Sequence, residues 1–504
     1  MIAKDNLPLS IVENEGFIQL MKTVAPLYTL PSRKTITRLL DAKYEILKNK
    51  FIDDIQHVSS FTITCDIWTD ISNKSYLGLT IHYLKTEIVL TKTTIGVIPL
   101  EKNHTSEYIK DELLLVLRDF KIDSSKIMAV VTDSASNMIN AINSTFGNRK
   151  HIPCMAHILA HVVPDSLKTI YPITEIITKV KSIVTLVKRS VVATDELVRL
   201  QKRDGRTDGT ILKFKQEVST RWNSTFYMIE RFLKLREYIY PVILKCPTSP
   251  EMITHDEFDV LTDVIKILQP IELVTREISG DLYPTCNIII PLIRCMTKVI
   301  NDCIPLTNYG INLKECILLE IERRFRDIER IQILTIATIL DPRFKKIHFN
   351  QPIAVSSAIS YINTLMQDAT NTNQNSTCTK TTPIMKCNET GTLWNFHDNL
   401  VASSTLTRDE PGGINVELRQ YLNQPVIPRH NDPLKYWQTL KHAYPMLFNI
   451  AIKYLAVTAT SVPSERLFSK AGIIKSDIRN RLTPNRLNML LFLGSLNRED
   501  WGFI

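Results

Sequence analysis

Three acidic residues occupy positions from which the sequence predicts binding of divalent cations. Asp66 lies in the strand-like run FTITCDIWT, Asp133 ends a second strand-like run, KIMAVVTD, and Glu465 lies much later, in SVPSERLFSKAG. Carboxylates that converge from two neighbouring strands and one helix can hold two divalent cations, which stabilise the attacking and leaving oxygens of a phosphoryl transfer. The pattern makes cleavage and transfer of nucleic-acid strands the first hypothesis, although a lone Asp in a strand can also be an edge residue or a turn former.

The sequence around the first two carboxylates predicts a mixed α/β sheet. Three runs rich in β-branched and aromatic residues, FTITCDIWT, SYLGLTIHYL and IVLTKTTIGVIPL, predict a meander of three strands. A helix (SEYIKDELLLVLRDF), a buried strand (KIMAVVTD) and a short strand (HIPC) follow, and SASNMINAI predicts another helix with Ser134 as its N-cap. This order is that of a ribonuclease H-like core, in which the carboxyl ends of strands face the ligand crevice.

The rest of the chain is predicted to be helical. Glu465 lies 332 residues beyond Asp133, so it joins the sheet only if a large insertion leaves the core and returns to it. The polar segment 369–392 lacks periodicity and is predicted to be disordered. The predicted domains are an N-terminal helical segment (1–58), the first part of the core (59–163), a helical insertion (164–415) and a C-terminal region that completes the core (416–504).

The composition is that of a globular protein, with 44% hydrophobic and 22% charged residues among 504. The longest apolar runs, such as IQILTIATIL and LNMLLFLGSL, are too short or too interrupted to span a bilayer, so we expect no membrane partner. MIAKDNLPLSIVENEG has no continuous apolar region, so we expect no secretory signal. Nine irregularly spaced cysteines argue for a reducing compartment rather than a disulfide framework.

Positive charge is concentrated near the C-terminus. The chain carries a net charge of +9, and residues 436–504 contain nine Lys and Arg against four Asp and Glu. Such residues bind phosphate backbones, although any one of them can equally belong to a solvated helix face. The basic residues of this region that we expect to contact DNA are Arg466, Lys470, Lys475, Arg479 and Arg481.

A cysteine and two histidines fall on one face of a predicted helix. Cys154, His157 and His161, in CMAHILAH, stand at i, i+3 and i+7. These residue types can bind zinc, but no fourth ligand follows nearby and the chain contains no CxxC…HxxxH finger. The pattern favours packing, or a position near the DNA, over a zinc site.

The motif STRWNST places a basic residue beside a large aromatic one, at Arg221 and Trp222. This pair suits contact with a phosphate combined with stacking on an unpaired base. Burial of the Trp in the helical core explains the motif equally well, and the sequence leaves both interpretations open.

These motifs together resemble the hAT superfamily of DNA transposases, and especially the BED zinc-finger proteins derived from it. The blocks that carry the resemblance are TCDIWTD, VVTDSASNM, CMAHILAH, STRWNST, ILDPRFK and SVPSERLFSKAGIIKSDIRNRLTPNRLNMLLFL, which occur in the family's order. The resemblance implies a ribonuclease H-like core with an Asp66, Asp133 and Glu465 triad. It also implies Mg²⁺-dependent cleavage at a transposon end, hairpin formation on the flanking DNA, and attack of the released 3′-OH on the target.

Further roles are implied by the same resemblance. Arg221 and Trp222 would stabilise the flanking DNA and a flipped base, and Cys154 and His157 match the family's Cys-x-x-His pair near the active site. The last block resembles the hAT C-terminal dimerisation region, so we expect a homodimer or a higher homo-oligomer in the nucleus. Its apolar residues, expected to pack against the fold and a second subunit, are Leu487, Leu490, Leu491, Phe492 and Leu493.

The N-terminus departs from the family pattern, because the sequence begins about where a BED finger would have ended. No zinc finger is therefore expected in this chain, which questions sequence-specific binding of transposon ends. The resemblance leaves two main hypotheses, a transposase with catalysis and a domesticated, non-catalytic DNA-binding dimer that regulates transcription or chromatin. A third, a SUMO ligase-like activity, has no independent feature in the sequence.

Overall fold

The computed structural model describes residues 1–70, 72–86, 88–218, 221–248, 250–280, 283–370, 394, 396–397, 400, 414–475 and 482–502. In this part of the chain a five-stranded sheet has the order β3-β2-β1-β4-β5. β1, β2 and β3 form an antiparallel meander, whereas β1 and β5 both run parallel to β4. The predicted mixed sheet is therefore confirmed. The strands are β1 (Phe61–Thr69), β2 (Ser75–Thr86), β3 (Val89–Leu100), β4 (Ile127–Thr132) and β5 (His151–Pro153).

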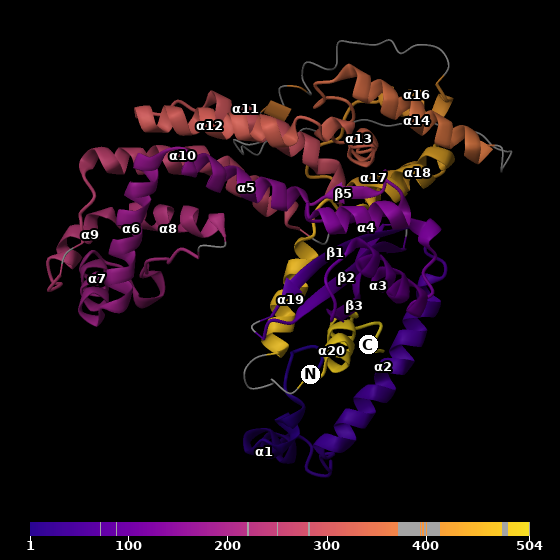
Figure 1. The fold of residues 1–504 in the computed structure, drawn as a ribbon, viewed down its shortest axis with the longest axis horizontal. Coiled ribbons are helices and arrows are strands. Elements are labelled where there is room, and N and C mark those ends of the chain that lie inside the picture. The colour runs from indigo at the N-terminus through magenta and orange to yellow at the C-terminus, as the bar shows by residue number, and fades with distance from the viewer. Residues whose placement is uncertain are drawn as a thin grey trace.

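Helices cover both faces of this sheet (Figure 1). A Cβ added at Gly78 in β2 would meet the ring of Phe468, which belongs to α19. Gly96 of β3 pairs with Leu79 of β2, the residue after Gly78. A Cβ added at Gly96 would instead meet Val116 of α3. Because neighbouring residues of a strand point to opposite faces, α19 and α3 lie on opposite sides of the sheet. The helices concerned are α3 (Ser106–Asp119), α4 (Ser136–Phe146) and α19 (Val462–Ile474).

The edge strand β3 is covered by α20 (Pro484–Ser495). The amide of Val97 donates to Asn488 Oδ1 at 2.9 Å, and that of Thr94 donates to Ser495 Oγ at 3.2 Å. Exposed edge amides can pair with other chains, so these two side chains remove part of a site of aggregation. The ring of Phe492 packs against aromatic residues of the N-terminal helix α2 and of α3's C-cap, which are Tyr44, Phe51 and Phe120.

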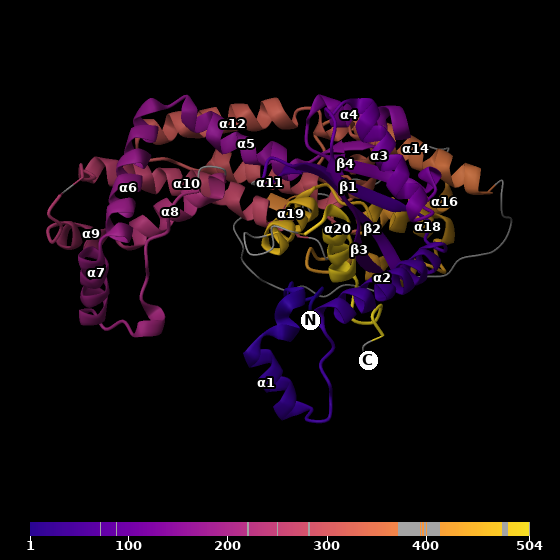
Figure 2. The same ribbon diagram turned by 60° about the horizontal axis from the view of Figure 1, so that its bottom comes forward.

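The N-terminal segment is helical, as predicted. It contains α1 (Glu15–Val24) and α2 (Arg33–Ile55). The Ser32 hydroxyl accepts from the Thr35 amide at 3.3 Å and caps α2, which confirms the start signal in PSRKT. α1 projects away from the body in both ribbon views and buries none of its residues (Figures 1 and 2).

A long series of helices separates β5 from α19. Their apolar faces form one continuous core that also includes residues of β4 and β5. α6 to α10 extend to one side of the sheet, and α13 to α18 lie next to it (Figure 1). The helices are α5 (Met155–Lys168), α6 (Tyr171–Arg189), α7 (Val191–Arg203), α8 (Trp222–Lys234), α9 (Arg236–Ile243), α10 (His255–Ile278), α11 (Ile289–Asp302), α12 (Asn308–Phe325), α13 (Gln332–Ile339), α14 (Pro352–Thr370), α16 (Val416–Asn423), α17 (Pro433–Leu440) and α18 (Pro445–Leu455).

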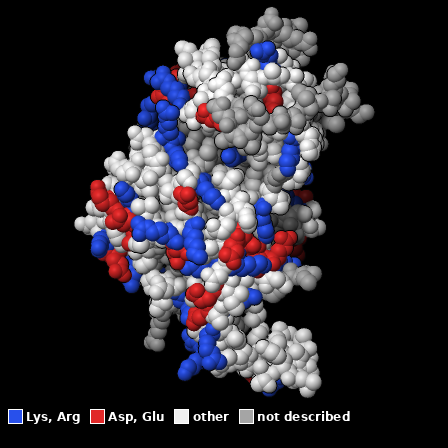
Figure 3. All heavy atoms as spheres, turned by 90° about the vertical axis from the view of Figure 1, so that its right-hand side faces the viewer, with Lys and Arg blue, Asp and Glu red and all other residues white. Residues whose placement is uncertain are grey.

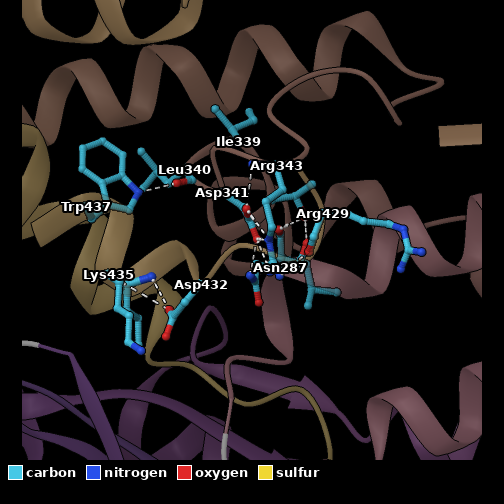
Figure 4. A network of polar contacts seen from close by, with 12 residues as sticks. Asn287, Ile339, Leu340, Asp341, Arg343, Arg429, Asp432, Lys435 and Trp437 are labelled. Atoms are coloured by element: carbon cyan, nitrogen blue, oxygen red, sulfur yellow. Dashed lines mark hydrogen bonds and ion pairs between the residues drawn. The ribbon is translucent and has the colours of Figure 1, made fainter. Parts of the chain in front are cut away.

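The ILDPRFK motif forms a buried polar network after α13 (Figure 4). The Asp341 carboxylate is completely buried and binds the Arg343 guanidinium in a bidentate pair, with one Nη2–Oδ2 distance of 2.7 Å. It also accepts from the Arg343 amide at 2.9 Å and from the Asn287 side chain. Trp437 of α17 donates its indole N–H to the Leu340 carbonyl at 2.7 Å. The motif therefore joins α13, α17 and the segment before α11.

Two local predictions need correction or fall outside the described residues. Ser134 does not cap α4, because Ala135 is the N-cap and its amide donates to Asp133 Oδ1 at 3.2 Å. Of the segment 369–392, predicted to be disordered, only the last two residues of α14 are described. In the described ranges no helix combines the length and the apolar character needed to cross a bilayer.

Candidate functional site

The carboxyl ends of β1 and β4 bring Asp66 and Asp133 together. The two strands are parallel, and their last recorded pair joins Thr64 to Val131. Asp66, inside β1, and Asp133, just after β4, each lie two residues further along, so they occupy neighbouring positions where the pairing of the two strands ends. The two acidic residues thus meet at the edge that commonly forms the ligand crevice of an α/β sheet.

Glu465 reaches the same region through α19, which packs on β1 and β2. The Ser464 hydroxyl donates to Thr64 Oγ1 at 3.3 Å, although the two residues are 400 positions apart. This bond places the first turn of α19 over β1, two residues before Asp66. Glu465 follows directly and is exposed. The insertion therefore leaves the sheet and returns to it, as the position of Glu465 requires.

The charges of the other two carboxylates act on Asp66. Burial raises the pKa of Asp66 to about 7, with the negative charge of Asp133 as the second cause and that of Glu465 as a smaller one. A hydrogen bond from the Ile67 amide at 2.8 Å opposes the rise. Removal of water raises the pKa of Glu465, while the charge of Arg221 lowers it. Perturbed carboxylates at the end of a sheet are typical of functional sites.

Oxygen ligands of this kind fit Mg²⁺ and Mn²⁺, which prefer carboxylates. Within the described ranges, however, no three His, Cys, Asp or Glu side chains lie as close together as ligands of one ion. The metal site of Asp66, Asp133 and Glu465 stays a prediction.

Cys154 fastens the loop before α19 to the end of β4. It is buried, caps α5, and its sulfur accepts from the amides of His157 at 3.4 Å and Ser461 at 3.2 Å. Its own amide donates to the Thr132 carbonyl at 2.7 Å. Cys154 therefore cannot contact DNA in this structure. Of the two roles that the pattern favours, packing and a position near the DNA, packing is the one observed.

The two histidines that follow point to the surface. His157 and His161 are exposed, and their Nε2 atoms lie 3.1 Å apart on α5. Burial, and then the neighbouring His157, lowers the pKa of His161. Among the described residues no third His, Cys, Asp or Glu side chain joins them in a group that could hold a metal ion. His157 stays a candidate for contact with DNA.

The STRWNST motif splits into an exposed and a buried residue. Arg221 is exposed at the N-terminus of α8, near enough to Glu465 to lower its pKa. Trp222 is 7% exposed and belongs to the helical core. Burial in the helical core, one of the two interpretations of this motif, is the one that the structure shows, and stacking of the ring on a flipped base stays a prediction. Arg221 is thus the member of the pair that can reach a phosphate near the carboxylates.

The basic residues predicted to bind DNA also differ from one another. Arg466 is exposed and donates to the Ser279 carbonyl at 2.8 Å, which leaves it beside the carboxylates. Lys470 is exposed one turn further along α19. Both positions are compatible with contact with a DNA backbone.

Lys475 differs from the other basic residues that were expected to contact DNA. Its ammonium group is largely buried, pairs with Asp70 and binds Tyr76 Oη at 2.7 Å. It therefore anchors the end of α19 to the β1–β2 hairpin and is not available to a phosphate. Arg479 and Arg481 lie outside the described residues.

The apolar residues predicted for dimerisation lie inside the subunit. All five are at most 4% exposed and belong to the core between α20, α2 and the sheet. Their packing against the rest of the fold is as expected, but they are not available as contacts with a second chain in this conformation. An interface in this region would have to use other, exposed residues. The five are Leu487, Leu490, Leu491, Phe492 and Leu493.

On the face shown in Figure 3, Lys and Arg are interspersed with Asp and Glu. This face presents no extended surface of a single sign, so it is a poor match for a polyanion. The exposed basic residues of α19, Arg466 and Lys470, are therefore better candidates for contact with a nucleic acid.

Gly78 sets how closely α19 approaches the carboxylates. A Cβ there would lie 2.6 Å from the Phe468 ring, which stacks on Trp68 and cannot easily move. A glycine inside a strand often marks such a close approach, and the glycine in SYLGLTIHYL is the sequence signal for this one. We expect Gly78→Ala to destabilise the protein by about 1–3 kcal/mol, because α19 must shift. Urea unfolding and faster amide exchange in α19 would report this change.

The matched control for this variant is Gly209→Ala. No atom lies within 4 Å of a Cβ at Gly209. We expect its unfolding midpoint to stay near that of the wild type. Equal stabilities for the two variants would show that the contact between β2 and α19 is not tight.

Three family models match the chain. They are the ZBED1 RNase-like domain over residues 64–158, the ZBED1 RNase-like helical domain over 152–267, and the hAT family C-terminal dimerisation region over 417–495. The chain therefore contains regions that match the ZBED1 RNase-like domains and the hAT family C-terminal dimerisation region. It is homologous both to AC transposases and to the zinc finger BED domain-containing proteins.

Individual relatives are distant but extend over most of this sequence. A Zea mays protein named as an AC transposase is 27% identical, and the match covers 98% of this chain and 63% of that protein. Human zinc finger BED domain-containing protein 4 is 24% identical, with 98% and 42% covered. The Hobo transposase of Drosophila melanogaster is 23% identical, with 60% and 46% covered. The chain thus spans less than two thirds of each of these relatives.

Proposed function

We propose that this chain is a hAT transposase-like nuclear protein that binds DNA, dimerises through its C-terminal region and performs metal-dependent DNA strand cleavage and transfer. The observation that carries the proposal is the convergence of Asp66, Asp133 and Glu465 from β1, β4 and α19. Acidic residues from these elements are what the chemistry needs, and the relatives include proteins named as transposases. The matched dimerisation region supports a homo-oligomer.

The finer fold assignment belongs to the same proposal. A mixed sheet with three antiparallel strands followed by two parallel ones is the arrangement expected of a ribonuclease H-like core. The helical insertion then comprises residues 164–415, and the C-terminal region 416–504, which contains α19, completes the core. Family models with RNase-like names over 64–267 support this assignment.

In the proposed mechanism Asp66, Asp133 and Glu465 hold Mg²⁺ or Mn²⁺. When bound, the metal supplies activation of the attacking oxygen and stabilisation of the leaving oxygen. Arg221, whose charge acts on Glu465, binds a phosphate of the strand and holds it beside the carboxylates. Cys154 keeps the loop before α19 against β4, so it positions Glu465 without contacting DNA.

The test is cleavage of a generic DNA duplex with Mg²⁺ or Mn²⁺ by the wild type and by Glu465→Gln. We expect cleavage by the wild type and a fall to the level without metal in the variant, because the amide is a poorer ligand for a hard cation. Folding of the variant is checked by circular dichroism. Cleavage that is unchanged in Glu465→Gln would come from another site or a contaminant and would contradict the assignment.

The second candidate is a domesticated DNA-binding dimer without catalysis. It is favoured by the spacing of the carboxylates, which in the described ranges is wider than that of a formed metal site. It is also supported by relatives named as zinc finger BED domain-containing proteins. DNA binding by a dimer that does not cleave with either metal would select this function, and a monomer in light scattering would exclude it.

A further inference from the structure

A basic pocket lies beside α19. It has a volume of about 250 Å³ and lies between the N-terminal segment, β2, β3, α19 and α20. Both ribbon views place the N-terminus next to α20 (Figures 1 and 2). The basic residues that line it are Lys4, Lys92, Arg466 and Lys470, and no acidic residue is among the described residues of its wall.

The wall of this pocket contains a buried hydroxyl without a partner. Thr80 of β2 is 3% exposed, and in the described part of the chain its Oγ1 atom has no hydrogen-bond partner. Leaving such a group unsatisfied costs about 1–3 kcal/mol, so a native structure that keeps one calls for an explanation. An oxygen of a bound ligand would accept the missing hydrogen bond.

The positive charges around Thr80 are held close to each other. Lys4 donates to the carbonyls of Gly494, at 3.3 Å, and Leu496, which fixes its ammonium group at the pocket. Burial, and then the charge of Lys470, lowers the pKa of Lys4. In the described part of the chain no carboxylate pairs with Lys470. Such a group of cations attracts a compact anion.

The N-terminal segment can lie this close because residue 494 is a glycine. A Cβ at Gly494 would lie 2.7 Å from the Ala3 carbonyl oxygen, a backbone atom that cannot turn away. The pocket is thus built from three segments that are far apart in sequence, around β2 and β3. This construction distinguishes it from a chance cluster of surface lysines.

The pocket and the carboxylates are related through α19. Pro463, Arg466 and Lys470 recur at i, i+3 and i+7 and face the pocket. Glu465 is turned by about 200° from Pro463, about 140° from Lys470 and about 100° from Arg466, so its side chain leaves the helix on a different side from the pocket. We propose that the pocket binds a phosphate of the DNA backbone, so that α19 holds the strand on one side and presents Glu465 to it on the other. This inference rests on the proposed function.

The test uses the full chain and a fluorescent generic duplex in a salt series. Thr80→Val removes the hydroxyl, and we expect it to weaken binding about tenfold, because hydrogen bonds to charged groups are worth about 1.5–3 kcal/mol. Lys470→Gln is expected to reduce the slope of log K against log salt by about 1. The control Lys435→Gln, exposed on α17 away from the pocket, should leave both quantities unchanged. Thermal unfolding should show Thr80→Val to be at least as stable as the wild type.

The outcomes separate this inference from the proposed function. Wild-type binding that neither pocket variant changes would overturn the pocket and leave DNA binding by the chain intact. Absence of any DNA binding by the wild type would overturn both. A second arm measures thermal shifts with inorganic pyrophosphate. One outcome is that pyrophosphate stabilises the wild type but not Thr80→Val, while the pocket variants bind DNA like the wild type. That outcome would assign the pocket to a free phosphate compound and overturn the DNA assignment.

Discussion

Asp66→Asn is expected to lower metal-dependent DNA cleavage by at least about 1000-fold, the scale of loss when a catalytic group is removed. Asp66 is the carboxylate most affected by its neighbours, since its pKa responds to both Asp133 and Glu465. Among the three carboxylates it is the one whose pKa is raised by the charges of both others, so a bound cation is expected to act on it strongly. The measurement is single-turnover cleavage of a duplex, with Asp302→Asn, an exposed residue of α11, as the control.

The same variant is expected to stabilise the metal-free protein above pH 7. A carboxyl group titrates near pH 4 in the unfolded chain, whereas the pKa of Asp66 is about 7 in the folded one. Between about pH 4 and pH 7 the Asp66 carboxyl is therefore protonated in the folded state and ionised in the unfolded state. The free energy of unfolding falls as pH rises through this window, by of the order of 3 kcal/mol, and Asn has no such dependence.

Unfolding of wild type and variant from pH 4 to pH 8 checks this expectation. The curve of Asp66→Asn should be flatter, and the two proteins should differ most at pH 8. Mg²⁺ or Mn²⁺ should stabilise the wild type increasingly above pH 6 and the variant much less, because a cation offsets the carboxylate charge. A variant that cleaves like the wild type, or that is less stable at pH 8, would remove Asp66 from the proposed metal site.

Asp341→Ala is expected to destabilise the protein by about 3–5 kcal/mol, because it removes one partner of a buried ion pair. The Arg343 side chain is 14% exposed and would keep only the Arg429 carbonyl, at 3.3 Å, as a hydrogen-bond partner among those recorded. Asn287 would lose its acceptor as well. Urea unfolding followed by Trp fluorescence suits the measurement, since Trp437 binds the Leu340 carbonyl in the same network.

The matched control is Asp327→Ala. Asp327 pairs with Arg330 at 3.1 Å, but both side chains are more than 60% exposed. Such pairs contribute at most about 1 kcal/mol. A loss for Asp341→Ala no larger than that of Asp327→Ala would show that the network of Figure 4 does not stabilise the helical part.

The sequence was sufficient for the elements whose patterns are local. β1 to β3 are rich in β-branched residues, and Ser32 precedes a helix that it caps. The meeting of Asp66 with Asp133 also followed from two strand ends, because parallel neighbours end at the same edge. These features depend on a few adjacent residues and on rules for strand order.

The sequence was not sufficient for residues whose partners lie far away along the chain. Nothing near Lys475 indicates that Asp70 takes up its charge, and nothing in STRWNST shows on which side of α8 the ring of Trp222 lies. The apolar run of α20 can equally serve a core or an interface, and only its contact with α2 and the sheet shows that it fills the core. Gly78 carried a usable signal, but its meaning depended on the arrival of α19.

The covering of β3 by α20 has a consequence for synthesis. The partners of the Val97 and Thr94 amides, Asn488 and Ser495, leave the ribosome about 400 residues later. At about 5–20 residues per second this delay lasts roughly 20–80 s. During that time the meander has an open edge and an uncovered face, the kind of surface that joins with other nascent chains. The sheet therefore gains the cover of its β3 edge only after α20 has been made.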